Sequence, residues 1–116
     1  MSFKLGTSNN RAILINEDNY YDLEQISNGS VSSDSVQALA SIDEINNLSS
    51  KLGEISPTGK LSDIELSNPV PNSRNSYAVG LNYRGHAEEG GMEIPEVPMV
   101  FTKHTSCFVG PNANVE

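Results

Sequence analysis

The stretch SNPVPNSRNS, residues 67–76, most constrains what this chain can fold into, because neither a helix nor a central strand runs through it. Its prolines lack the backbone N–H that both structures use, and the serines and asparagines around them favour turns. We therefore predict a boundary here. Residues 1–68 form a small N-terminal α+β domain, and residues 69–116 begin a second domain that opens with strands.

Short apolar runs separated by turn formers dominate the first domain. FKLG (3–6) and RAILIN (11–16) flank the polar link TSNN and predict a β-hairpin. YYDLEQ (20–25) predicts a third strand, and LSDIEL (61–66) a further short one. The expected buried residues of the third strand are Tyr20, Tyr21 and Leu23.

Apolar residues recur every three or four positions between these strands, which predicts an amphipathic helix with one buried stripe. Asp34 or Ser33 is expected to cap its start, and Gly53 to end it. Ser41 and Glu44 also form a capping-box pattern, which favours two short helices broken near Ser41. The stripe consists of Val36, Leu39, Ile42, Ile45, Leu48 and Leu52.

The charge balance excludes some classes of partner. The 116 residues carry a net charge of −8, with seven Lys and Arg spread along the chain, so no basic patch is available for nucleic acid or for an anionic membrane surface. A single cysteine, Cys107, cannot form an intrachain disulfide, which fits a reducing compartment. With no apolar run of signal-peptide or membrane-span length, we expect a soluble, cytoplasmic protein.

The segment YAVGLNYRGHAEEGG, residues 77–91, is the most suggestive chemically. If RGHAEE is helical, His86 and Glu89 lie on the same face, and the carboxylate can orient the imidazole while its second nitrogen accepts a proton. An exposed histidine on a polar turn is the simpler interpretation. Zinc held by His86, His104 and Cys107 is disfavoured because the ligand set is incomplete, and Cys107 in an apolar run is expected to be inert packing.

YAVGLNYRGHAEEGG, IPEVPMVFTKHTS and VGPNANV together resemble the opening catalytic segment of the fumarylacetoacetate hydrolase family, and residues 1–68 resemble more loosely the N-terminal domain of two-domain bacterial members. The resemblance implies an α+β chain whose catalytic domain is a strand-rich β-roll, usually dimeric. It also implies Mg²⁺ or Mn²⁺ and substrates that are 2-oxo acids or β-dicarbonyl compounds such as acylpyruvates. The reactions of this family are C–C hydrolysis, decarboxylation, isomerisation and dehydration.

Carried onto this sequence, the resemblance makes His86 the general base and Glu89 its orienting partner, so that the pair activates water. Tyr83 and Arg84 would line the substrate pocket, and Lys103 would lie near the anionic end of the substrate.

Three departures from the family pattern stand out. Gly85 replaces an acidic residue before the histidine, and His104 stands where relatives have proline or an apolar residue. The metal-binding carboxylates of the family are expected beyond Glu116, so we expect a truncated piece that is inactive alone. The alternative is a non-catalytic interaction module that docks on a full-length relative.

Overall fold

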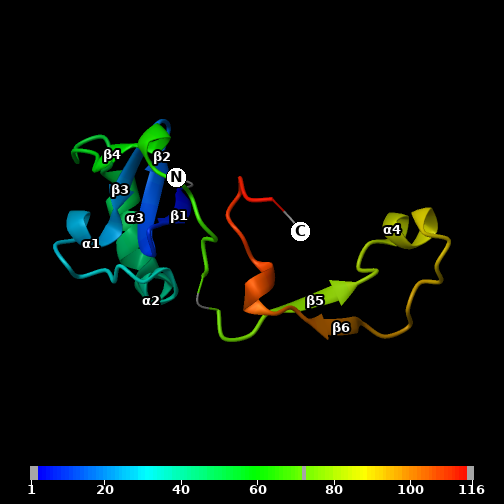
Figure 1. Cartoon of the computed structure of the whole chain (residues 1–116). Helices are drawn as coiled ribbons and strands as arrows, with labels where there is room; N and C mark the ends of the chain where they lie inside the picture. The colour runs from blue at the N-terminus through cyan, green and yellow to red at the C-terminus, as the bar shows by residue number, and fades with distance from the viewer. Residues whose placement is uncertain (1–2, 72, 115–116) are drawn as a thin grey trace. The chain divides into compact units, whose positions relative to one another are not determined.

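The computed structural model describes residues 3–71 and 73–114, which fall into two compact units (Figure 1). Unit 1 comprises residues 1–72 and 108–116, and unit 2 comprises residues 73–107. Both combine helices with antiparallel strands, so the expected mixture of helix and sheet is confirmed. Among the described residues, no helix is long and apolar enough to span a membrane.

Unit 1 is built on an antiparallel sheet whose strands follow chain order, β1-β2-β3-β4. Strands β1 (Lys4–Ser8), β2 (Arg11–Asn16) and β3 (Asn19–Asp22) confirm the predicted hairpin and third strand. Asn9 and Asn10 both have positive φ, as a two-residue hairpin turn requires, and asparagine tolerates this conformation well. The third strand ends earlier than predicted, because Asp22 caps helix α1 (Leu23–Ile26).

The core lies between the sheet and the helices. Ala12 and Leu14 of β2 point to this side, and Leu14 is paired with Leu5 on one neighbouring strand and Tyr21 on the other. Of the three residues expected to be buried in the third strand, Tyr21 and Leu23 are buried and Tyr20 is half-buried. The cluster comprises Ala12, Leu14, Tyr21, Leu23, Val31, Ala38, Ile45 and Leu52.

The opposite face of the sheet is also covered. Ile13 alternates with Leu14 and is buried on this other side. A Cβ at Gly6 would lie 2.9 Å from the Ile15 side chain and 3.5 Å from that of Leu66, so the later segment packs closely over the strands. The N–H of Ser67 also donates to the carbonyl of Thr7 at 2.8 Å. Burial on both faces explains the unbroken apolar run in β2.

The predicted helix is broken into α2 (Ser35–Ala38), η1 (Leu39–Ser41) and α3 (Ile42–Ser50). The break near Ser41 is confirmed, and so is the Asp34 cap, which accepts a 2.9 Å hydrogen bond from the N–H of Gln37. The capping box is wrong. Ser41 makes no side-chain cap, and Glu44 instead accepts a hydrogen bond from Ser30.

The predicted buried stripe is wrong over its first half. Val36, Leu39 and Ile42 are exposed by 40–43%, whereas Ile45 and Leu52 are buried and Leu48 is half-buried. The 3₁₀ turn at η1 advances about 120° per residue instead of 100°, so it shifts the buried face of the segment. Before the break, the buried residues of α2 are Ser35 and Ala38.

The strand predicted at residues 61–66 is also wrong. β4 (Gly59–Lys60) has only two residues, and a 3₁₀ turn, η2 (Leu61–Asp63), follows it at once. The N–H of Ile64 donates to the carbonyl of Leu61, which closes this turn. Leu61 and Ile64 are three apart, a spacing that places them on one side of a 3₁₀ turn but on opposite faces of a strand.

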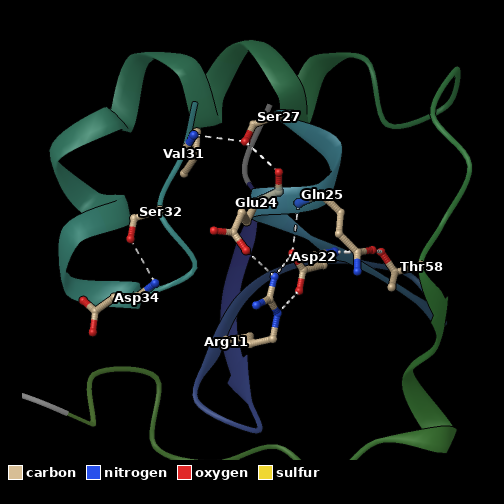
Figure 2. A network of polar contacts seen from close by, with 9 residues as sticks. All are labelled: Arg11, Asp22, Glu24, Gln25, Ser27, Val31, Ser32, Asp34 and Thr58. Carbon is tan, nitrogen blue, oxygen red and sulfur yellow. Dashed lines mark hydrogen bonds and ion pairs between the residues drawn. The ribbon is translucent and has the colours of Figure 1, made fainter. Parts of the chain in front are cut away.

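A polar network that the sequence analysis missed joins β2, β3 and α1 (Figure 2). The guanidinium of Arg11 donates twice to Asp22, at 2.5 and 2.9 Å, and once to Glu24 at 2.8 Å. The Asp22 carboxylate also accepts a hydrogen bond from the backbone N–H of Gln25. The backbone N–H of Asp22 donates to the hydroxyl of Thr58. Burial acts to raise the pKa of Asp22, but the hydrogen bonds from Arg11 and Gln25 outweigh it and hold this pKa below its ordinary value.

We expect the stability of unit 1 to fall on acidification because of Asp22. The folded pKa lies below the unfolded value of about 3.9, so the contribution is complete above that pH and is lost as the pH falls through the folded pKa. Asp22→Asn should cost about 1–3 kcal/mol at neutral pH and flatten the acid limb. Urea unfolding at several pH values measures both effects. Asp63→Asn, an exposed control, should keep the wild-type acid limb, and identical acid limbs for wild type and Asp22→Asn would contradict the prediction.

Candidate functional site

The candidate site lies in unit 2, which is built on a two-stranded antiparallel hairpin (Figure 1). Strand β5 (Tyr77–Gly80) pairs with β6 (Met99–Thr102), with Tyr77 opposite Thr102 and Gly80 opposite Met99. Both strands are short, since a turn follows β5 and a 3₁₀ turn, η3 (Thr105–Cys107), follows β6. The long connection between the strands carries helix α4 (Arg84–Glu89).

RGHAEE forms helix α4, so the condition that puts His86 and Glu89 on one face of a helix is met. The helix ends in a Schellman motif, in which Met92 N–H donates to Ala87 and Gly91 N–H donates to Glu88. Gly91 takes the left-handed conformation of that motif, with φ of +61°. The Gly90–Gly91 pair therefore gives this helix a defined end.

The turn before α4 contains an unfavourable backbone conformation. Leu81 has φ of +50°, a region that costs a residue with a side chain roughly 1–2 kcal/mol. It directly follows β5 and precedes Asn82 and Tyr83. Strained residues of this kind cluster at functional sites. The sequence carries no signal for it, because leucine is not a residue that favours positive φ.

Four of the predicted site residues lie together on α4 or just before it. Tyr83 is its N-cap residue and is 75% exposed, and Arg84, His86 and Glu89 are exposed on the helix. Ala87 is the buried residue of α4. Within the part of the chain that the structure describes, the side chains of His86 and Glu89 make no hydrogen bond or ion pair, so the orienting role of Glu89 stays a prediction.

Lys103 lies at the other end of the hairpin. Its N–H donates to the carbonyl of Ser76 at 2.9 Å, one residue beyond the Tyr77–Thr102 pair. Its ammonium lies over the ring of Phe101, 5.3 Å from the centroid. Four strand residues, about 13 Å, separate this end of the hairpin from the end where α4 begins. The substrate-binding role of Lys103 therefore stays a prediction.

A pocket of about 290 Å³ opens beside Lys103, and sequence reasoning did not find it. It is lined by residues 74–77, which lead into β5, and by residues 102–105, which end β6 and follow it, including Arg74 and His104. The strand register brings these residues together, although they are far apart in the sequence. Cys107, expected to be inert packing, is instead exposed on η3.

The described side chains do not fit a divalent metal. Over residues 3–71 and 73–114, no group of three or more His, Cys, Asp or Glu side chains lies close enough to hold an ion.

No protein-family model matches the chain. Over 38 residues, 33% of the chain, it is 50% identical to proteins named "Putative hydrolase" from Burkholderia cenocepacia and Burkholderia multivorans, of which this stretch is 14%. It is also similar to the crystal structure of a "putative HpcE protein" from Mycobacterium smegmatis, with a TM-score of 0.76 and 27% identity over 97% of the chain. The chain spans 39% of the length of that protein. These similarities indicate a hydrolase- or lyase-type fold.

Proposed function

We propose that this chain forms the N-terminal part of a metal-dependent hydrolase or related lyase of the fumarylacetoacetate hydrolase family. Its substrates are 2-oxo acids or β-dicarbonyl compounds of the acylpyruvate type, and the whole protein is a cytoplasmic homodimer that uses Mg²⁺ or Mn²⁺. The observation that carries this proposal is the structural similarity to the HpcE protein, which extends over 97% of the chain and therefore over both units. The identity to hydrolases over 38 residues supports it.

In this proposal the chain supplies the proton-transfer group. His86 accepts a proton from water, and Glu89, three residues later on α4, orients the imidazole through its other nitrogen. Exposure of both side chains leaves them free to approach a substrate. Tyr83 and Arg84, next to them, contact the substrate, and Lys103 attracts its anionic end. The metal ligands belong to other residues of the whole protein, because the described residues do not supply them.

One observation favours a second candidate, a non-catalytic module that docks on a full-length relative. Large apolar side chains are exposed over both strands of the hairpin and the segments before and after α4, and such surfaces mark protein interaction sites. In this candidate His86 has no chemical role. In unit 2 the exposed large apolar residues are Tyr77, Val79, Tyr83, Met92, Ile94, Val97, Met99, Val100 and Phe101.

An assay of the whole gene product that contains this sequence separates the two candidates. With Mg²⁺ and an acylpyruvate, we expect turnover in the ordinary enzyme range, of roughly 1–10³ s⁻¹, that is lost on adding a chelator. The 116-residue chain alone should show none. A whole product that converts no 2-oxo acid or β-dicarbonyl compound, yet co-purifies with a full-length relative, would favour the docking module.

A further inference from the structure

Unit 1 contains a cavity of about 180 Å³ that is lined by side chains of strands β1, β2 and β3. Ser8 is paired with Arg11, and Ile13 is paired with Asp22. Directly paired residues point to the same face of a sheet, and residues two apart on a strand share a face. All four side chains therefore lie on the face opposite Leu14 and the apolar core. The strand pairing fixes where each of them stands.

Ser8 brings a buried hydroxyl group to this cavity. The residue is 6% exposed, and among the described residues its Oγ has no hydrogen-bond partner. Most buried polar groups in proteins are hydrogen-bonded, because burying a hydroxyl without a partner is unfavourable. By the strand register, this hydroxyl lies on the face of the sheet that carries the cavity. A polar ligand group in the cavity supplies the missing partner.

The charges at the cavity are already balanced, which favours a neutral ligand. Arg11 donates to both Asp22 and Glu24, so two carboxylates lie against its guanidinium (Figure 2). A bound anion would add a third negative charge beside these two, and like charges repel. A bound cation would have to displace Arg11 from the carboxylates. Neither class of ion therefore gains from this site.

Several donors of the lining are open to a neutral oxygen. Arg11 uses Nε and Nη2 for its carboxylate partners, and its Nη1 donates to no other described residue. The Gln25 side chain accepts from Thr58 through Oε1, whereas its amide NH₂ has no partner in the described chain. The Tyr20 hydroxyl is likewise without a described partner. Hydroxyl oxygens suit this set, because each can accept from these donors and also donate back.

We propose that this cavity binds a small neutral polyhydroxy compound, a polyol or a monosaccharide. One ligand hydroxyl pairs with the Ser8 hydroxyl, and others accept from Arg11 and its neighbours. The carbon chain packs on the aliphatic side chains of Ile13 and Ile64, which also line the cavity. The volume is below the roughly 300 Å³ at which pockets for drug-sized ligands begin, so the ligand has few carbon atoms.

Titration of the full chain with xylitol and, separately, with D-xylose tests the proposal by ¹H–¹⁵N spectra. We expect saturable shifts at the amides of residues 8–11 and 20–22, with a Kd on the order of 10 mM for at least one probe. The two probes have equal numbers of carbon atoms, so the tighter one shows whether the site selects an open chain or a ring. Malonate, a small anion, should bind more weakly than either.

Ser8→Ala should weaken binding roughly fivefold, the loss of one hydrogen bond between neutral groups. Tyr20→Phe keeps the ring, removes only the hydroxyl, and should weaken binding by a similar factor. Ser35→Ala is the matched control. Ser35 is also buried and its hydroxyl also lacks a described partner, but it does not line the cavity. It should change the Kd by less than about twofold.

Three results overturn the proposal: no saturable shift at residues 8–11 and 20–22 with either probe, equal Kd values for Ser8→Ala and Ser35→Ala, or malonate binding more tightly than both probes. Unchanged spectra at residues away from each substitution show that the variants fold. The measurement concerns unit 1 and needs no turnover, so it can fail or succeed independently of the proposed enzyme activity.

Discussion

His86→Gln should lower kcat of the whole gene product by about 10²–10⁴-fold, the usual contribution of a positioned general base. Glutamine keeps a polar side chain on exposed helix α4 but cannot accept and hold a proton, so the fold and the helix should be retained. KM should change little, because proton transfer occurs in the transition state and contributes little to substrate binding. Steady-state kinetics with Mg²⁺ and an acylpyruvate give both constants.

Glu88→Gln is the matched control for His86→Gln. Glu88 lies on the same helix as His86, two residues away and so on a different face. It does not belong to the proposed His86–Glu89 pair, so the substitution leaves that pair intact. We expect kcat within about twofold of wild type for it, as for a surface change away from the reacting atoms. A His86→Gln enzyme with undiminished kcat would remove the imidazole from the mechanism.

The parts of the fold that the sequence predicted correctly are those governed by local chemistry. The turn predicted within TSNN is made by Asn9 and Asn10, because asparagine tolerates positive φ, although Thr7 and Ser8 belong to β1. Asp34 caps α2 because its carboxylate reaches the N–H of Gln37. The helical turn that contains His86 follows from local spacing in the same way. None of these features depends on a partner distant in the sequence.

The parts that sequence reasoning missed depend on tertiary partners. Residues spaced three or four apart fit a continuous helix as well as one interrupted by a 3₁₀ turn, so the pattern could not show that Leu39 would face solvent. Arg11 and Asp22 meet because β2 and β3 are adjacent. Arg74 and Lys103 line one pocket only through the register of β5 and β6, which the one-dimensional pattern does not specify.

The second large effect is expected at Leu14, where Leu14→Ala should destabilise unit 1 by about 2–5 kcal/mol. Leu14 is fully buried and lies between Leu5 and Tyr21 on the neighbouring strands, so truncation leaves a cavity that the sheet backbone cannot close. A loss of this size is a large fraction of the roughly 5–15 kcal/mol that a small domain has. Urea unfolding followed by circular dichroism measures it, and hydrogen exchange at β2 amides confines the result to unit 1.

Leu39→Ala is the control that also tests the corrected helix. It removes the same atoms from a residue that is 43% exposed, so we expect a change within about 0.5 kcal/mol. If Leu39 instead belonged to a continuous buried stripe with Ile45, both Leu39→Ala and Leu14→Ala would cost several kcal/mol. Equal losses would mean that the helix is unbroken and that η1 does not shift its buried face. If η1 interrupts the helix, the Leu39 side chain faces solvent. Leu39→Ala should then cost little, and only Leu14→Ala should cause a large loss of stability.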